Sequence, residues 1–305
     1  MHSELPPHVH VHKKKGCYMN KSALFSTAII SGSPKAVNVL SPLLKQKCQL
    51  TLIGDYHSSL NDERGADFTC YSARMAQYGR SDMQDLAHFF MKAFEGGSDA
   101  IILLGDIISF PSEKGIETLS GMIKDSPIPV YYTAGNHDWH YEGMPGSDKT
   151  QDRRLLPLYC GRNPLNYAVK VNGIKLLMID NSVYEILPSQ LEFCRRELAD
   201  GTPAVICCHI PFYLGMPFHS VTGFGCGHPD WGAATDPYCK IERRERWAPH
   251  LSPETFAYCE EVLTAENVLG ITAGHFHEYS LATVNSKFQL VVPSYQSTNL
   301  TLSGF

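Results

Sequence analysis

AIILLGD, residues 100–106, consists of five apolar residues followed by a glycine and an aspartate. Five consecutive apolar residues of this kind are typical of a strand buried on both faces, as in a parallel sheet. The glycine allows a tight turn and places Asp106 just beyond the carboxyl end of the strand. The same order, an apolar run followed by polar side chains, recurs along the chain. This recurrence is the basis of the fold prediction.

Helical patterns precede and follow this strand. Ser81 with Gln84 predicts a capping box that begins a helix. Its apolar residues repeat at helical spacing, at Met83, Leu86, Phe89, Phe90 and Phe94. Downstream, a helix around residues 116–123 leads to an apolar strand at 130–133. Together with an upstream strand at 50–53, these lengths indicate βαβ units and a mainly parallel sheet segment.

The second half of the chain predicts a second sheet. Asn172-Gly173 is a strong hairpin signal between strands at 167–171 and 174–179. Further elements are a helix capped by Ser189 and Glu192, a strand at 204–208, a helix from Ser252-Pro253, a strand at 268–272, and two strands around Asn285-Ser286. The expected fold class is α/β (α+β), as a two-sheet β-sandwich flanked by helices.

The chain is expected to have one domain at residues 49–305. Residues 1–48 are assigned as an N-terminal tail and lead-in, because the start is rich in His and Lys without a hydrophobic period. Residues 213–251 are rich in Gly, Pro and aromatic residues and have little periodicity. This stretch is predicted to be a long insertion. Long loops in compact domains are often functional, so a lid that shapes the substrate site is expected.

The composition is ordinary for a soluble globular protein, with 43% hydrophobic and 19% charged residues. A net charge of −5 without a broad basic stripe argues against nucleic acid as a partner. No run approaches the roughly 20 apolar residues of a membrane span, so no membrane partner is expected. The ten cysteines are scattered without a framework, which favours buried thiols in a reducing compartment. A cytoplasmic location is therefore expected.

Five predicted strands each end in polar side chains. The clusters are Asp55-Tyr56-His57, Asp106, Asn136-His137-Asp138, His209, and His275-Phe276-His277. In open α/β sheets, ligand sites form in the crevice beyond the carboxyl ends of the strands, so the five clusters can converge. Carboxylate, amide and imidazole groups suit hard-to-borderline divalent metals. Each cluster alone is a weak signal, since a Gly-Asp is commonly a turn and a single His after a strand is usually structural. All five together predict a metal site.

These ordered motifs, from about residue 50 to 277, resemble the calcineurin-like metallophosphoesterase superfamily. The resemblance implies a metallophosphoesterase-like fold and two divalent or mixed-valence metal ions, with Mn, Fe and Zn as candidates. It implies that the first ion is held by Asp55, His57 and His277, that Asp106 bridges, and that Asn136, His209 and His275 complete the second site. His137 is implied as the leaving-group or transition-state residue, and Asp138 is an available neighbour that could assist it.

The resemblance implies hydrolysis of phosphate esters by a metal-bridging hydroxide, as a phosphodiesterase or phosphatase acting on a small or nucleotide-like substrate. Many relatives carry Asp or Asn three residues after the bridging Asp, where this chain has Ser109. That serine disfavours the purple acid phosphatase and protein serine/threonine phosphatase branches. Two alternatives stay open: a non-catalytic or weakly catalytic metal-binding interaction scaffold, and a nuclease.

Overall fold

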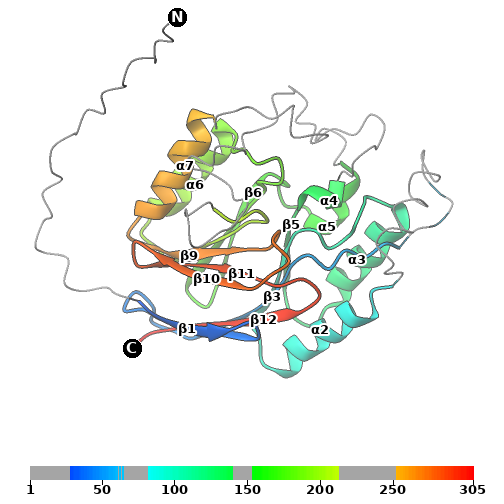
Figure 1. Cartoon of the computed structure of the whole chain (residues 1–305), viewed down its shortest axis with the longest axis horizontal. Coiled ribbons are helices and arrows are strands. Elements are labelled where there is room, and N and C mark those ends of the chain that lie inside the picture. The colour runs from blue at the N-terminus through cyan, green and yellow to red at the C-terminus, as the bar shows by residue number, and fades with distance from the viewer. Residues whose placement is uncertain (1–27, 61, 63, 65–81, 140–152, 213–251) are drawn as a thin grey trace, which may run out of the picture.

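The computed structural model describes residues 28–60, 62, 64, 82–139, 153–212 and 252–305. Two six-stranded sheets pack face to face, and helices cover the outer side of each (Figure 1). This arrangement confirms the predicted two-sheet α/β fold. Residues 1–27 of the predicted tail and lead-in, and the whole predicted insertion at 213–251, lie outside the described residues.

The first sheet contains the strand with which the sequence analysis begins. Its order is β1 (Ile29–Ser33), β2 (Ala36–Leu40), β12 (Ser297–Ser303), β3 (Cys48–Ile53), β4 (Ala100–Leu104) and β5 (Val130–Thr133). β3, β4 and β5 are parallel, so their carboxyl ends lie at one edge of the sheet. The β1–β2 hairpin, to which the sequence assigned no role, belongs to this sheet because β2 pairs with β12.

The second sheet has the order β10 (Ser280–Val284), β11 (Lys287–Val291), β9 (Val268–Ala273), β8 (Ala204–Cys207), β7 (Ile174–Ile179) and β6 (Asn166–Val171). β7, β8, β9 and β11 run parallel, and the edge strands β6 and β10 are antiparallel to their neighbours. The predicted hairpins at Asn172-Gly173 and Asn285-Ser286 form the β6–β7 and β10–β11 turns.

The longer helices cover the two outer faces. α2 (Gln84–Glu95) and α3 (Glu113–Asp125) lie with the first sheet, and α6 (Pro188–Leu198) and α7 (Pro253–Thr264) lie side by side on the second (Figure 1). Two short helices, α4 (Asn136–Trp139) and α5 (Leu156–Tyr159), follow β5. No helix within the described ranges is long and apolar enough to cross a lipid bilayer.

The core follows from the two-residue period of the strands. In β7, Leu176 and Met178 point into the core between the sheets, and Leu177 and Ile179 point toward α6 and α7. Both faces are apolar because both faces are covered. The hydroxyl of Tyr167 bonds the backbone of Tyr132 at 3.0 and 2.9 Å and joins the two sheets at their β5 and β6 edges. The polar strand ends are therefore held on a rigid scaffold.

Two predicted helix starts are wrong and one is confirmed. α2 begins at Gln84, whose N–H donates to the Asp82 side chain, so Ser81 does not begin it. α6 begins at Pro188 and not at Ser189, because Gln190 accepts the N–H of Leu187 and proline suits the first helical position. α7 begins as predicted, with the Ser252 hydroxyl accepting the N–H of Thr255.

Candidate metal centre

The five predicted strand-end clusters converge between the two sheets. Three groups of side chains place ligand atoms within 4.8 Å of one another and could hold a metal ion. They are Asp55, His57 and His277; His57, Asp106 and His137; and Asp106, His209 and His275. The groups overlap at His57 and Asp106, so they form one continuous centre. The sequence prediction that these residues meet at the strand ends is thus matched by their placement.

The backbone at this centre adopts an uncommon conformation. Five of the seven residues predicted as ligands have positive φ angles between 51° and 73°: Asp55, His57, Asp106, His275 and His277. A left-handed non-glycine residue costs about 1–3 kcal/mol and persists only where surrounding contacts hold it. The loops after β3 and β4 supply such contacts, since the N–H groups of Asp55 and His57 donate to the carbonyls of Gly105 and Asp106. Such strain clusters at functional sites.

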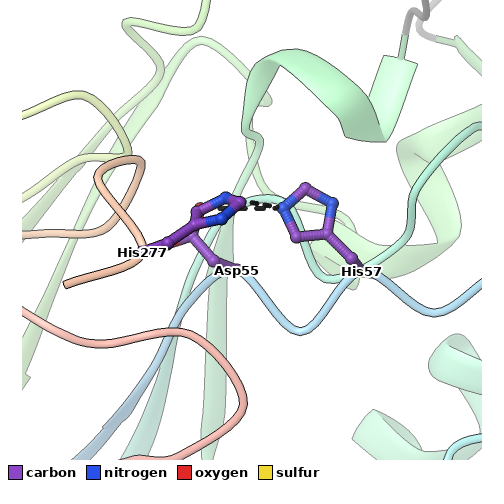
Figure 2. Close-up of side chains that lie close together, drawn as sticks. All are labelled: Asp55, His57 and His277. Carbon is purple, nitrogen blue, oxygen red and sulfur yellow. Dashed lines mark hydrogen bonds and ion pairs between the residues drawn. The ribbon is translucent and has the colours of Figure 1, made fainter. Parts of the chain in front are cut away.

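Asp55, His57 and His277 form the first group, in which the rings of His57 and His277 direct nitrogens toward each other at an interplanar angle of 63° (Figure 2). Their Nε2 atoms are 3.0 Å apart, and Nε2 of His277 lies 3.4 Å from Asp55 Oδ1. The other Asp55 oxygen accepts the N–H of His275 at 2.7 Å, which fixes the carboxylate. Asp55 and His57 are buried, whereas the His277 side chain is 47% exposed. An ion could therefore enter from the His277 side.

Asp106, His209 and His275 form the other outer group. Asp106 Oδ2 is 3.2 Å from Nε2 of His209 and 3.9 Å from Nε2 of His57, which places it between the two outer groups. Nε2 of His209 is 3.3 Å from Nδ1 of His275. The other His209 nitrogen, Nδ1, donates to the carbonyl of Leu104 at 2.8 Å and so fixes the ring. Asp106 is in position to serve both groups.

Two buried oxygens at this centre have the character of metal ligands. Asp55 Oδ1 and Asn136 Oδ1 are inaccessible to water and have no hydrogen-bond donor among the described residues. A buried polar atom without a partner is costly unless an ion or water satisfies it. Asn136 immediately precedes His137, whose N–H donates to Asp106 Oδ1 at 2.8 Å. The residues present therefore fit bound cations, with one such oxygen from each of the two predicted sites.

Two of the histidines favour the neutral form, which is the form that binds a metal. Burial lowers the pKa of His57 to about 4 and the pKa of His275 to about 3. His209 differs: burial acts to lower its pKa, but the adjacent Asp106 carboxylate raises it to about 10. Burial likewise acts to raise the pKa of Asp106, yet His209 and the other imidazoles hold it well below its usual value. The charged forms of Asp106 and His209 thus stabilise each other.

His137 lies beside the centre and is oriented by backbone. Its ring contacts that of His57 edge-on, with centroids 4.9 Å apart, and its Nδ1 is 3.4 Å from the carbonyl oxygen of Ser109. The Ser109 side chain does not take the place of the Asp or Asn that many relatives carry at this position, because its hydroxyl donates to the carbonyl of His57 at 2.8 Å. Ser109 therefore contacts His137 through its main-chain carbonyl and not through its side chain.

Asp138, predicted as a catalytic neighbour of His137, is buried and contacts the backbone of the loops that follow β4 and β5. Its Oδ2 accepts the N–H groups of Asp106 and Gly135 at 2.8 and 2.7 Å, and its Oδ1 accepts the N–H of Ile108 at 3.0 Å. Burial raises the pKa of Asp138, and the charge of Asp106 raises it further. Both oxygens join the β4 loop to the β5 loop. These contacts support a positioning role, and a catalytic role for Asp138 stays a prediction.

Replacing Asp138 with alanine is expected to destabilise the fold strongly. Three buried N–H groups would lose their acceptor, which at about 1–3 kcal/mol each lowers the free energy of unfolding by roughly 3 kcal/mol or more. Asp138→Asn keeps one acceptor oxygen and is expected to lower the free energy of unfolding by less than Asp138→Ala does. Urea unfolding of the metal-free proteins measures both, with exposed Asp125→Ala as the control. Equal stability of Asp138→Ala and the control would contradict the positioning role.

Two glycines let the loops approach one another. Gly105 has a φ of 82°, and a Cβ there would collide with the backbone of Gly135 and with the His209 ring. A Cβ on Gly135 would collide with the carboxylate of Asp106. The Gly-Asp and Gly-Asn-His-Asp motifs thus carry glycine for close packing around Asp106.

Sequence reasoning missed Tyr184, whose hydroxyl lies 2.7 Å from Nε2 of His275. Tyr184 follows β7 by five residues and belongs to none of the polar strand-end clusters. The only nearby signal is the polar pair Asp180-Asn181 directly after the strand, which has no recognisable motif. A contact between loops of β7 and β9 becomes visible only in three dimensions.

Comparison with known proteins gives one family. Residues 49–279 match the sequence model of the family described as calcineurin-like phosphoesterase. A protein of Fibrobacter succinogenes named probable cyclic nucleotide phosphodiesterase is 24% identical over 176 residues, which are 57% of this chain and 61% of that protein. This chain thus spans less than two thirds of that relative's length.

Solved structures with a similar fold include two phosphatases. A dimetal phosphatase from Danio rerio gives a TM-score of 0.48 at 13% identity, covering 81% of this chain and 87% of that one. A purple acid phosphatase from yellow lupin gives a TM-score of 0.47 at 12% identity, covering 84% of this chain and 46% of that one. The family assignment rests on the sequence match, which extends from β3 past the last predicted ligand, His277. The chain belongs to the calcineurin-like phosphoesterase family.

Proposed function

We propose that this protein hydrolyses phosphate esters, phosphodiesters of nucleotide-like substrates first among them, with two metal ions. The observation that supports this most strongly is the position of Asp106, which forms one ligand group with His209 and His275 and another with His57, itself a member of the group of Asp55 and His277. One carboxylate between two groups is what a dinuclear centre requires. The protein would use this centre on a small phosphoester, and nucleic acid is not the expected substrate.

The seven residues divide between two sites. Asp55, His57 and His277 would hold the first ion. Asp106, whose Oδ2 lies 3.9 Å from Nε2 of His57, would be shared with the second site. His209 and His275 would hold the second ion together with Asn136, whose buried Oδ1 lacks a donor. The mixture of carboxylate, amide and imidazole ligands suits Mn, Fe and Zn ions, in divalent or mixed-valence pairs.

The ions would neutralise charge on the phosphoryl oxygens and lower the pKa of a water that attacks phosphorus. The protein's own contribution is positioning and proton transfer. Asp138 and the glycines fix the loops that carry Asp106 and Asn136. His137, with Nδ1 directed at the Ser109 carbonyl, keeps Nε2 as the nitrogen that can deliver a proton to the departing alcohol.

Metal affinity is expected to rise as the pH rises from about 6 to 8. A proton on Nε2 of His209 competes with the ion, and Asp106 raises the pKa of that ring to about 10 in the metal-free protein. The ion held by His209 must displace that proton, so the apparent association constant of the second site should increase by about tenfold per pH unit. Mn²⁺ titrations at several pH values measure the slope. His209→Gln has no titratable proton there and should bind more weakly but with a flatter slope; equal slopes would contradict this assignment.

The preference for diesters rests on two observations. The relative from Fibrobacter succinogenes is named for cyclic nucleotides, although it shares only 24% identity over the matched region. In addition, Ser109 departs from the residues that the sequence resemblance associates with purple acid and protein phosphatases. The name of the relative favours a phosphodiesterase, and Ser109 removes two branches of phosphatases from consideration.

Hydrolysis of bis-p-nitrophenyl phosphate, p-nitrophenyl phosphate and a 3′,5′-cyclic nucleotide tests the proposal. Metal-stripped protein is assayed before and after addition of Mn²⁺. Metal-dependent turnover with a higher kcat/KM for the diesters is expected. A clear preference for the monoester would retain the phosphoesterase but overturn the diester assignment. Two bound ions without turnover of any ester would favour the interaction scaffold.

A further inference from the structure

We infer that residues 180–184, sequence Asp-Asn-Ser-Val-Tyr, form an outer support for the second metal site, with Tyr184 as the positioning partner of His275. This segment directly follows β7 and contains none of the predicted ligands. Its side chains nevertheless reach the loops that carry His209, His275 and Asn136. The inference rests on the proposed metal centre. It concerns how tightly the second site binds its ion, independently of the first site.

The contact between Tyr184 and His275 is compatible with the histidine tautomer that the second metal site needs. The Tyr184 hydroxyl lies 2.7 Å from Nε2, and the two rings meet edge-on with centroids 5.5 Å apart. Nδ1 of the same imidazole faces His209 Nε2 at 3.3 Å, so Nδ1 is the atom that belongs to the ligand group. A neutral imidazole that binds an ion through Nδ1 carries its proton on Nε2. The Tyr184 hydroxyl would accept a hydrogen bond from that Nε2–H and fix the ring plane.

The backbone of Tyr184 shows that this contact is imposed by its surroundings. Tyr184 has a φ of 62°, which is rare for a bulky side chain and costs about 1–3 kcal/mol. Its N–H donates to the carbonyl of Asn181 at 2.8 Å, and its side chain is buried. The next residue, Glu185, accepts the N–H and hydroxyl of Ser252 at 2.9 and 2.6 Å. The turn is thus anchored to the start of α7 and holds the ring against His275.

Asn181 fixes the loop that carries His209. Its Oδ1 accepts the N–H groups of His209 and Ile210 at 3.2 and 3.0 Å, and its Nδ2 donates to the carbonyl of Ile210 at 2.7 Å. One side chain therefore holds the main chain on both sides of the His209 peptide. With Nδ1 of His209 bonded to Leu104, both the ring and the backbone of this ligand are set.

Ser182 links the segment to the loop of Asn136. The Ser182 hydroxyl accepts the indole N–H of Trp139 at 3.0 Å, and Trp139 lies in the same short helix as Asn136. Asp180 holds Ser182 in place, because its Oδ1 accepts both the N–H and the hydroxyl of Ser182 at 3.0 and 2.7 Å. Asn181, Ser182 and Tyr184 therefore each contact a different element that carries a ligand of the second site.

The test compares two buried tyrosines. Tyr184→Phe removes only the hydroxyl that faces His275, and Tyr167→Phe makes the same change at the sheet edge, where the hydroxyl bonds Tyr132. Calorimetric titration of the metal-stripped full chain with Mn²⁺, and metal content after dialysis, give the affinity of each site. We expect Tyr184→Phe to weaken binding of one Mn²⁺ by about 10–100-fold and to leave the other nearly unchanged. Tyr167→Phe should bind both ions as wild type does.

The outcomes separate this inference from the proposed function. Wild-type affinity for both ions in Tyr184→Phe would overturn the inference and leave the proposed function standing. Wild-type protein that binds no Mn²⁺ would overturn the proposed function and the inference with it. If Tyr184→Phe does not fold, as judged by thermal unfolding without metal, Ser182→Ala serves as the second variant. It loses the Trp139 bond and should also weaken one Mn²⁺ selectively; equal binding to wild type would then overturn the inference.

Discussion

Replacing Asp106 with asparagine is expected to abolish metal-dependent phosphoester hydrolysis, with a loss above about 10²-fold, the upper range for residues that only support a metal ligand. Asp106 is shared by two ligand groups, and its Oδ2 lies 3.2 and 3.9 Å from the histidines on either side. An amide keeps the size but removes the negative charge that both ions require. Turnover of a phosphodiester at saturating Mn²⁺, together with metal content, measures the effect.

The exposed Asp125→Asn is the matched control, because it makes the same chemical change outside the site. Its activity and metal content should equal those of wild type. Urea unfolding of metal-free Asp106→Asn should show a cooperative transition, which separates loss of the metals from loss of the fold. Retention of full activity by Asp106→Asn would remove Asp106 from the centre and contradict the shared-ligand assignment.

Replacing His137 with alanine is expected to reduce kcat by about 10²–10⁴-fold for a substrate with a poorly acidic leaving group, the usual contribution of a general acid. Nδ1 of His137 faces the Ser109 carbonyl and leaves Nε2 as the nitrogen able to give a proton. A p-nitrophenolate leaving group needs little protonation, so the loss should be much smaller with p-nitrophenyl esters. Comparing kcat for an alkyl and a p-nitrophenyl phosphodiester measures this difference.

The exposed His88 on α2 supplies the control, since His88→Ala should leave both substrates unaffected. His137 also lies within reach of Asp106 and His57, so metal content must be measured in the same preparation. An equal loss for the two leaving groups, with two ions still bound, would show that His137 acts on the metals or on substrate binding and not as the acid.

The strands of the fold could be predicted because buried parallel strands are continuous apolar runs. Ala100–Leu104, Val130–Thr133 and Ile174–Ile179 have the bounds that the sequence predicts. The β1–β2 hairpin and β12 were not predicted. β2 and β12 alternate buried with more exposed residues and pair across the whole length of the chain. Two helix starts were misplaced. α2 begins after Met83, which makes no side-chain cap, and α6 begins with Pro188, where the Gln190 side chain accepts the N–H of Leu187.

The candidate site could be predicted at the level of the residues that end strands, because parallel strands bring their carboxyl ends together. Contacts across loops could not be predicted in the same way. Asp138 stands in a recognisable motif, yet only the structure shows its oxygens on the backbone of Asp106, Ile108 and Gly135. Tyr184 belongs to no motif, and its left-handed backbone is invisible in the sequence. The supporting residues of a metal centre depend on geometry that spacing does not encode.

The most direct test of the account measures phosphodiester turnover against the number of Mn²⁺ ions bound per chain, as metal-stripped protein is titrated. In the proposed centre Asp106 lies between the two sites, with Oδ2 3.9 Å from Nε2 of His57 and 3.2 Å from Nε2 of His209. Turnover is therefore predicted to stay low after the first equivalent, to rise with the second, and to level off at two. Full turnover at one ion per chain, or turnover that persists without bound metal, would contradict the two-metal account.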